Sequence, residues 1–152
     1  MNFWLMKSEP DVFDIDDLRK RPRQTEHWDG VRNYQARNMM RDRMKKGDQA
    51  FFYRSNCKEP GIVGVMEIVR EAYPDDSAWN PKSPYYDAKS TSIQPRWFMV
   101  DIRYRRKTRR CITLREMKGH PELADLPLLR RGNRLSIMPV TPDQWHFILS
   151  LE

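Results

Sequence analysis

Cysteine is scarce in this chain, and the placement of the few cysteines excludes two kinds of protein. Cys57 and Cys111 are the only two among 152 residues, and they lie far apart. A disulfide framework needs several cysteines, and a multi-cysteine metal site needs closely spaced pairs, so neither is expected. The scarcity fits a reducing compartment, and we predict no metal and no cofactor.

Common catalytic and membrane signatures are absent as well. The sequence has no glycine-rich phosphate loop, no His-Glu-x-x-His helix and no paired-cysteine zinc motif, which excludes the common nucleotide hydrolases and metalloproteases. Its three histidines are scattered and typical of surface or packing positions. Because no basic leader and no long apolar run are present, we expect no signal peptide and no membrane span. The expected location is cytoplasmic, or nuclear if the source is eukaryotic.

Basic residues, in contrast, are abundant. The sequence has 28 Lys and Arg residues against 21 Asp and Glu residues, which gives a formal net charge of +7. This balance predicts a polyanionic partner, although charge alone does not choose between DNA, RNA and an acidic protein. The length fits one domain over residues 1–152, and we expect a monomer.

Hydrophobic patterning predicts an α+β domain. Stretches rich in β-branched and aromatic residues predict strands at residues 2–7, 49–55, 61–71, 97–104 and 135–140. Capping residues and helical spacing predict a helical turn capped by Asp11, helices at 33–44, 113–118 and 122–129, and a closing helix capped by Thr141. Together these elements predict a strongly twisted sheet, able to close into a small barrel, flanked by short helices.

Residues 73–96 form a segment too long for a simple turn. The segment contains several prolines and four aromatic residues: Tyr73, Trp79, Tyr85 and Tyr86. Loops of this length are usually functional or disordered, and the aromatic content favours an ordered loop that packs on the body of the domain.

Eight short motifs follow one another along nearly the whole chain. They are Trp4-Leu5-Met6-Lys7-Ser8-Glu9-Pro10, Trp28-Asp29-Gly30-Val31-Arg32-Asn33-Tyr34-Gln35-Ala36-Arg37-Asn38, Lys46-Gly47-Asp48, Tyr53-Arg54-Ser55-Asn56, Gly61-Ile62-Val63-Gly64, Tyr86-Asp87, Pro95-Arg96-Trp97 and Arg134-Leu135-Ser136. In this order they strongly resemble the EVE-domain family, although any one of them alone would mean little.

The resemblance implies both a fold and a function. The fold is PUA-like, a twisted β-barrel with peripheral helices. The function is that of a non-catalytic reader, which holds a flipped modified base in a deep pocket and is associated with modified cytosines in DNA. Met138 is the main departure, because a glutamine is expected there. If Met138 contacts the ligand, the base preference differs from that of the family.

The matched motifs and their chemistry supply candidate walls for such a pocket. A flipped base presents two flat faces, which aromatic rings can stack against at about 1–3 kcal/mol per base. The candidate walls are Trp28, Tyr34, Tyr53 and Trp97. Core packing is the alternative for any aromatic residue: the two roles are equally favoured for Trp97, whereas the polar neighbours of Trp28 favour the wall.

Polar motif residues just beyond the predicted strands are candidates to read the base edge. They are Lys7, Ser8, Glu9, Asn33, Ser55, Asn56, Arg134 and Ser136. Glu9 can accept a hydrogen bond from an exocyclic amine such as cytosine N4, provided that neighbouring residues orient its carboxylate. The alternatives are a helix cap for Ser8 or Asn33, a turn for Ser55 and Asn56, and an ion pair of Glu9 with Arg37 or Arg134.

Two runs of basic residues are candidates to hold phosphates. The first is Arg19, Lys20, Arg21 and Arg23. The second, expected at a strand end or hairpin, contains Arg105, Arg106, Lys107, Arg109 and Arg110. Arg32 and Arg37 are expected at the border of the pocket, where they also bind the phosphate backbone. Such runs are usually solvated faces, but in a protein that holds a flipped base they can contact the backbone regardless of sequence.

Three other functions compete with a DNA reader. One is an RNA-binding PUA-like module. A second is an enzyme acting on a base or nucleotide, in which Glu9 would be the general acid or base, although its motif supplies no nucleophile or metal partner. A third is a protein-interaction module that uses the basic surface.

Overall fold

A computed structural model describes all residues from Met1 to Glu152. Its strands are β1 (Phe3–Ser8), β2 (Thr25–His27), β3 (Gln49–Arg54), β4 (Gly61–Pro74), β5 (Phe98–Thr113) and β6 (Ile137–Val140). Its α-helices are α1 (Ile15–Lys20), α2 (Tyr34–Asp42), α3 (Leu114–Lys118) and α4 (Pro142–Ser150), and the short 3₁₀ helices are η1 (Pro22–Gln24), η2 (Asp76–Trp79), η3 (Pro121–Leu123) and η4 (Pro127–Leu129).

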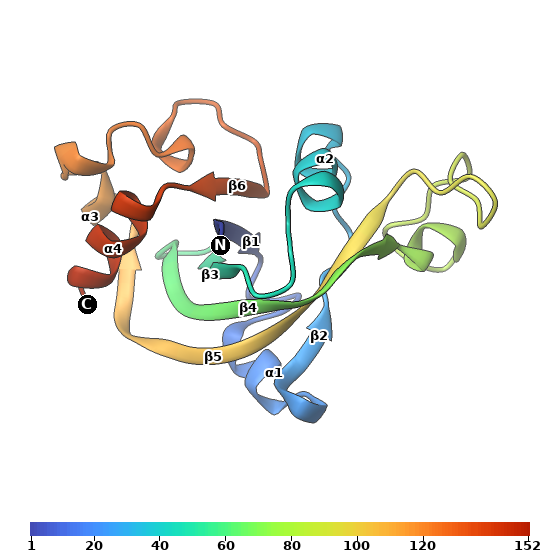
Figure 1. Ribbon diagram of the computed structural model, residues 1–152, viewed down its shortest axis with the longest axis horizontal. Helices are drawn as coiled ribbons and strands as arrows, with labels where there is room; N and C mark the ends of the chain where they lie inside the picture. The colour runs from blue at the N-terminus through green and yellow to red at the C-terminus, as the bar shows by residue number, and fades with distance from the viewer.

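The six strands form one mixed sheet in the order β2-β5-β4-β3-β1-β6. β1 runs parallel to β3 and antiparallel to β6, and all other neighbours are antiparallel. Register shifts interrupt the long β4–β5 pair at four places, and this pair curves strongly across the molecule (Figure 1). The predicted α+β class, with a twisted sheet and short helices, is confirmed. The sheet does not close into a barrel, because β2 and β6 remain its edges.

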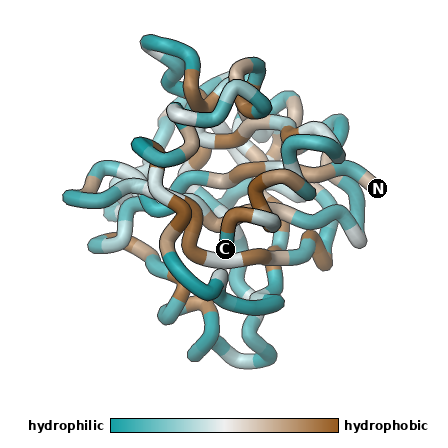
Figure 2. Tube along the Cα trace, turned by 90° about the vertical axis from the view of Figure 1, so that its left-hand side faces the viewer, coloured by the Kyte–Doolittle hydropathy of each residue, from teal (hydrophilic) through white to brown (hydrophobic).

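Alternation along the strands divides the core between the two faces of the sheet. Trp4, Met6 and Phe52 point to the face that α1 and α2 cover, whereas Leu5 and Phe51 point to the face that α3 and α4 cover. Figure 2 shows the result along the chain: the hydrophobic segments lie inside and the outer loops are hydrophilic. The apolar part of β1 therefore lies between the core layers on the two faces of the sheet, and Lys7 and Ser8 at its carboxyl end follow this apolar part.

Several elements begin or end at residues other than the predicted ones. The first helix is capped by Asp14, which forms a capping box with Asp17, and not by Asp11. β5 continues to Thr113, so the basic run lies inside a strand and not at a strand end or hairpin. Residues 122–129 form two separate 3₁₀ helices around Leu126. The predicted caps of α2 and α4 are confirmed.

The 75–97 loop, which joins β4 to β5, is ordered against the body as expected. β4 extends to Pro74, and η2 follows directly after the capping residue Asp75. Figure 1 shows the loop at the far end of the curved β4–β5 pair. This end lies near the start of α2, so the loop can reach the segment that joins β2 to α2.

A candidate base-binding cavity

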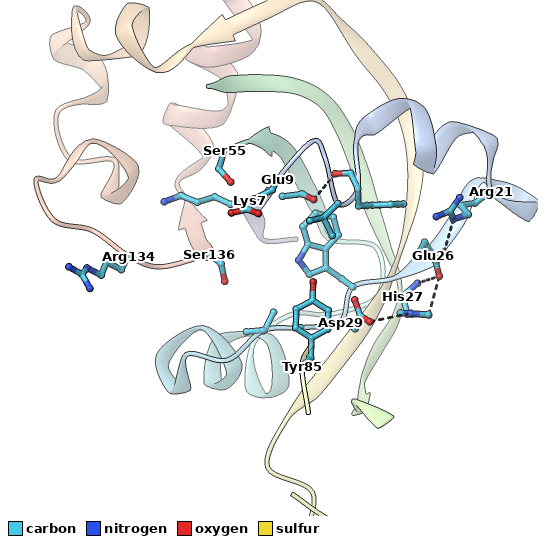
Figure 3. Close-up of a pocket in the computed structure, with 16 residues that line it drawn as sticks. Lys7, Glu9, Arg21, Glu26, His27, Asp29, Ser55, Tyr85, Arg134 and Ser136 are labelled. Carbon is cyan, nitrogen blue, oxygen red and sulfur yellow. Dashed lines mark hydrogen bonds and ion pairs between the residues drawn. The ribbon is translucent and has the colours of Figure 1, made fainter. Parts of the chain in front are cut away.

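One cavity of about 600 Å³ opens where the carboxyl end of β1 meets the β2–α2 segment (Figure 3). Seven of the predicted pocket residues line it, namely Lys7, Ser8, Glu9, Trp28, Ser55, Arg134 and Ser136. Residues far apart in sequence therefore meet at one site. A volume of roughly 300–1,000 Å³ is typical of small-ligand pockets, so a nucleobase fits in a cavity of this size.

Backbone hydrogen bonds fix the polar side of the cavity. Lys7 N–H donates to the Ser136 carbonyl at 2.8 Å, and Ser55 N–H donates to the Ser8 carbonyl at 2.9 Å. The Ser8 hydroxyl donates to the Phe13 carbonyl at 2.6 Å, so toward a ligand this hydroxyl can act only as an acceptor. Burial lowers the pKa of Lys7. The ends of β1 and β3 and the start of β6 thus present a fixed set of short polar groups.

The Glu9 carboxylate is oriented by a neighbouring side chain. Asn56 Nδ2 donates to Glu9 Oε1 at 3.0 Å. Asn56 has φ 52°, a left-handed conformation that asparagine tolerates better than most residues. The alternative that Glu9 pairs with Arg37 or Arg134 is wrong, because Glu9 takes part in no ion pair. Glu9 Oε2 is free to accept from a ligand.

Trp28 serves the core and lines the cavity. Its side chain is 7% exposed and packs edge-to-face on Phe52, with ring centroids 5.5 Å apart, and on Phe13 at 6.3 Å. Its backbone N–H donates to the Val100 carbonyl at 2.7 Å, which continues the β2–β5 pairing by one residue. The indole is therefore a rigid surface, held on one side by the core while the other borders the cavity.

Tyr85 lines the cavity but was not among the predicted site residues. It projects from the 75–97 loop toward the cavity (Figure 3). Its ring lies against Gly30, where a Cβ atom would be 2.6 Å from Tyr85 Cζ, and Gly30 has φ +80°. Burial raises the pKa of Tyr85, so the phenol stays protonated and can both donate and accept. Its position within a pair of tyrosines next to a motif was the available sequence signal.

Arg32 tethers the loop that carries Tyr85. Its Nε and Nη2 donate to the Tyr85 carbonyl at 3.1 and 2.7 Å, and its Nη1 lies 3.1 Å from Oδ2 of the fully buried Asp75. Gly30 N–H donates to the same Asp75 oxygen at 2.9 Å. The expectation that Arg32 holds DNA phosphates does not fit this geometry, because its guanidinium is already committed inside the protein.

A chain of charged residues forms another side of the cavity. Arg21 Nε lies 2.8 Å from Glu26, Glu26 lies 3.0 Å from His27 Nδ1, and His27 Nε2 lies 3.6 Å from Asp29 (Figure 3). Burial raises the pKa of Asp29, more than the adjacent His27 lowers it. The sequence motifs did not assign His27, Glu26 or Asp29 to the site, although Asp29 lies inside the longest motif.

Five predicted pocket residues do not line the cavity: Asn33, Tyr34, Tyr53, Asn56 and Trp97. Tyr53 is buried with Phe51 on the opposite face of the sheet. Asn33 caps α2 by accepting from Ala36 N–H at 3.0 Å, so the cap that was its alternative role is confirmed. Asn56 contacts the site only through Glu9.

Trp97 and Tyr34 form a second aromatic assembly, which holds the end of the 75–97 loop. Their rings stack with centroids 4.8 Å apart, and Trp97 Nε1 donates to Asp87 at 2.7 Å. Arg37 lies over the Tyr34 ring at 4.7 Å and donates from Nη1 to the Arg96 carbonyl at 2.9 Å. These residues position the loop, and Arg37, like Arg32, is engaged within the protein.

The basic run of β5 is largely neutralised by carboxylates of other elements. The ion pairs are Arg105–Glu67 at 2.8 Å, Arg106–Glu152 at 2.6 Å, Lys107–Asp16 at 3.1 Å and Arg110–Glu116 at 2.6 Å. Only Arg109 lacks an ion pair in this run, and none of the five residues lines the cavity.

Met138 also lies away from the cavity, fully buried on the opposite face of the sheet. The departure from the family at this position therefore leaves the cavity wall unchanged.

The sequence and the fold of this chain are similar to those of known proteins. The sequence matches the EVE domain over residues 2–151. The chain belongs to the EVE-domain family. Thymocyte nuclear protein 1 of Gallus gallus is 49% identical to this EVE domain over 98% of the chain and 68% of that protein. The Homo sapiens protein of the same name is 48% identical over 98% of the chain and 73% of its own length.

Solved structures of other EVE-domain relatives have the same fold. A crystal structure of human THYN1 protein in complex with DNA containing 5-methylcytosine has a TM-score of 0.95 and 47% identity, covering 99% of this chain and 97% of that one. A Pseudomonas putida protein has a TM-score of 0.94 and 48% identity, covering 98% of each chain. In this EVE domain, none of the helices combines the length and apolarity needed to cross a lipid bilayer.

Proposed function

We propose that this chain, as a single EVE domain over residues 1–152, is a non-catalytic reader that binds DNA and holds a flipped modified cytosine in the cavity. The observation that carries the proposal is the likeness to human THYN1 protein, whose structure contains DNA with 5-methylcytosine. The likeness covers nearly the whole of both chains at 47% identity, so the segments that build the cavity lie within the shared fold.

The cavity walls suit the flat faces of a base. Trp28 is a rigid indole surface, and Tyr85 is a second ring that Gly30 and Arg32 hold in place. Stacking on aromatic side chains offsets part of the cost of unstacking a base from the duplex. The apolar residues Phe13 and Val31 also line the cavity, so a methyl group on the base can be buried there.

The polar groups of the cavity suit the edge of cytosine. The oriented Glu9 carboxylate and the Ser8 hydroxyl can accept from the N4 amino group, while Lys7 can donate to the O2 carbonyl. A base with a keto group in place of the amine would leave two acceptors facing each other. Cytosine derivatives are therefore favoured over thymine.

An enzyme acting on the base is the competing function. His27 lies 3.6 Å from Asp29 at the cavity, an arrangement that general acid–base catalysis can use. Incubation of the protein with DNA containing 5-methylcytosine, followed by mass spectrometry of the bases, separates the two functions. We expect the input bases to be recovered unchanged, whereas a converted base would overturn the non-catalytic assignment.

The reading function is tested by comparing two adjacent tyrosines. Tyr85 lines the cavity, whereas Tyr86 is 46% exposed and does not. We expect Tyr85→Ala to weaken binding of a duplex containing one 5-methylcytosine by about 1–3 kcal/mol and Tyr86→Ala to leave it unchanged. Fluorescence anisotropy with modified and unmodified duplexes at one stated salt concentration measures this. Equal binding by Tyr85→Ala and the unmutated protein would exclude Tyr85 as a wall.

The same titration separates DNA from RNA as the natural ligand. Matched single strands of DNA and RNA that carry the same modified cytosine differ in the 2′-hydroxyl group, and we expect the protein to prefer the DNA strand. We further propose that the domain acts as a monomer within the compartment that holds the DNA.

A further inference from the structure

Basic side chains without carboxylate partners flank the cavity on two sides. On one side, Arg130, Arg131 and Arg134 are exposed and form no ion pair; on the other, Lys20 and Arg23 are exposed and form none. Arg134 itself lines the cavity, as does Arg21, the neighbour of the second group. Figure 3 places Arg134 and Arg21 at opposite ends of the cavity. We call residues 130–134 the first arm and residues 20–23 the second arm.

The backbone of the first arm is fixed. Asn133 Nδ2 donates to the Pro127 carbonyl at 2.5 Å, and Leu135 N–H donates to Asn133 Oδ1 at 2.9 Å. Asn133 N–H donates to the Arg130 carbonyl at 3.2 Å, and Gly132 has φ +77°, which closes the turn. The three arginines therefore extend from an ordered turn, and Arg134 at the end of this turn lines the cavity.

The second arm has an unusual backbone. Arg23 and Gln24 both adopt left-handed φ values, 57° and 55°, although neither is glycine or asparagine. Gln24 N–H donates to the Arg21 carbonyl at 2.7 Å, and Thr25 Oγ1 donates to the Arg23 carbonyl at 3.0 Å, so the turn is closed by its own residues. Uncommon backbone conformations of this kind cluster at functional sites, where the surrounding structure maintains them.

We infer that the two arms hold the phosphates on either side of the extruded nucleotide, so that the DNA strand crosses the mouth of the cavity from one arm to the other. The inference rests on the proposed function. A base that leaves the duplex rotates about its own backbone, so its two flanking phosphates stay at the mouth while the base enters. Unpaired cations on both sides can neutralise these phosphates, and such contacts position the strand without reading its sequence.

The β5 run is less suited to this role. Its cations already face carboxylates, so a phosphate bound there would have to displace Glu67, Asp16, Glu116 or Glu152. In the arms only Arg21 faces a carboxylate, that of Glu26, whereas Lys20, Arg23, Arg130, Arg131 and Arg134 have no such competitor. The structure therefore places the backbone contacts in the loop before β6 and in the turn before β2.

The test removes two charges at a time from the unmutated protein. The arm variants are Arg131→Gln/Arg134→Gln and Lys20→Gln/Arg23→Asn, in which asparagine suits the left-handed φ of position 23. The control is Lys45→Gln/Lys46→Gln, just before β3, where Lys45 lies 4.0 Å from Glu71 and Lys46 forms no ion pair. These lysines precede the end where Phe3 pairs with Gln49, whereas the cavity lies where Ser8 pairs with Arg54. A second comparison, Arg105→Gln/Lys107→Gln, removes two ion-paired cations of β5.

Anisotropy titrations across a salt series, with duplexes that do or do not contain 5-methylcytosine, measure the effect. We expect each arm variant to bind both duplexes about tenfold more weakly, and the slope of log affinity against log salt to decrease by about 0.9 for each phosphate that is no longer neutralised. The control and the β5 variant should retain the slope. Arm variants that behave like the control would overturn the inference. If the second-arm variant has a lower melting temperature than the unmutated protein, Lys20→Gln alone provides the test, and the expected change in the salt slope is then half as large.

The two proposals fail in different ways. The arm variants can lose salt-dependent binding while the unmutated protein binds 5-methylcytosine and cytosine duplexes equally well. That result would support the role of the arms in holding phosphates and would overturn the proposed reading of the modified base. If the protein clearly prefers 5-methylcytosine and the arm variants bind with unchanged affinity and salt slope, only the proposal that the arms hold the phosphates is wrong. If the unmutated protein binds neither duplex, both proposals are wrong.

Discussion

The Glu9 carboxylate is held by a protein donor before any ligand arrives. Asn56 occupies Oε1 and leaves Oε2 for the ligand, and no cation neutralises the group. An oriented acceptor discriminates better than a mobile one, because a mismatched keto group cannot push it aside into water. In this chain, Glu9 is therefore the residue best placed to distinguish amino-bearing from keto-bearing bases.

Replacing Glu9 by Gln keeps the shape of the side chain and adds a donor. We expect Glu9→Gln to weaken binding of 5-methylcytosine DNA by about 1–3 kcal/mol and to relax the rejection of thymine at the same position. Competition titrations with the two duplexes give the ranking, and a melting curve of the same protein should change little, because Glu9 forms no ion pair. An unchanged ranking with a lowered Tm would remove Glu9 from the reading site.

The aromatic residues show where sequence reasoning succeeded and where it could not. The polar neighbours of Trp28 predicted a wall, and Trp28 does line the cavity. Tyr53 does not line the cavity, because one step along a strand reverses the face: Phe52 packs with Trp28, whereas Tyr53 faces the other way. Trp97 does not line the cavity either, because its partners are Asp87 of the loop and Tyr34 of α2, which only the folded chain brings to it.

The 75–97 loop is the element whose order the cavity depends on. Arg32 holds Tyr85 and Gly30 holds Asp75, the first residue of the loop. Arg37 holds the Arg96 carbonyl and Trp97 holds Asp87. Because Arg32 donates from two nitrogens to one carbonyl and also reaches Asp75, lysine cannot reproduce its contacts.

Arg32→Lys should loosen the loop around Tyr85, although residue 32 does not itself line the cavity. We expect faster amide hydrogen exchange over residues 76–90 and a loss of preference for 5-methylcytosine that approaches the loss in Tyr85→Ala. Arg37→Lys is the matched control, because Arg37 bonds to the Arg96 carbonyl and not to Tyr85. If Arg32→Lys exchanges as slowly as the control and binds normally, the tether does not determine the position of Tyr85.

Among the elements, those with apolar alternation were predictable and those without it were not. β1, β3 and the first part of β4 follow the expected ranges closely. β2 consists of Thr25, Glu26 and His27, with no apolar pattern, and forms because it pairs with Asp101–Arg103 of β5. β5 runs past its predicted end because carboxylates on other elements compensate its arginines, and sequence alone does not reveal such pairing.

At the scale of the whole molecule, Glu152 joins the end of the chain to the middle of β5. Its carboxylate accepts from Arg106 at 2.6 and 2.8 Å and from Arg109 N–H at 2.9 Å. The hydrogen bonds from Arg106 and, to a smaller extent, from Arg109 N–H lower the pKa of Glu152 from its ordinary 4.5 to about 2. A carboxyl group with a depressed pKa stabilises the fold fully above its unfolded pKa, and this contribution is lost as the pH falls through the folded value.

We expect Glu152→Gln to reduce the loss of stability between about pH 4.5 and about pH 2, measured by urea unfolding at a series of pH values. The difference at neutral pH should be about 1 kcal/mol, because Arg106 is 46% exposed and solvent screens the pair. Glu122→Gln, at an exposed residue without an ion pair, serves as the control. If the free energy of unfolding of the two variants depends on pH in the same way, the contacts of Glu152 with Arg106 and Arg109 contribute nothing to stability at acid pH.

The hydrophobic pattern of the sequence does not predict the order of the six strands in the sheet. β3, β4 and β5 follow one another along the chain and are neighbours in the sheet, as is usual for consecutive strands. The placement of β1 between β3 and β6 depends on contacts between residues more than 40 positions apart, such as Leu5 with Phe51 and with Met138. The resemblance to the EVE-domain family supplied the fold, but not the open edges at β2 and β6.

The tethered loop has a consequence for the thermodynamics of recognition. Because Arg32 and Asp75 order the Tyr85 segment during folding, its conformational entropy is lost then and not when a ligand binds. The cavity presents a rigid floor from the strand ends and a wall that is already in place. A variant that loosens the wall keeps the contacts with the bound ligand, yet its binding entropy measured by calorimetry becomes more unfavourable.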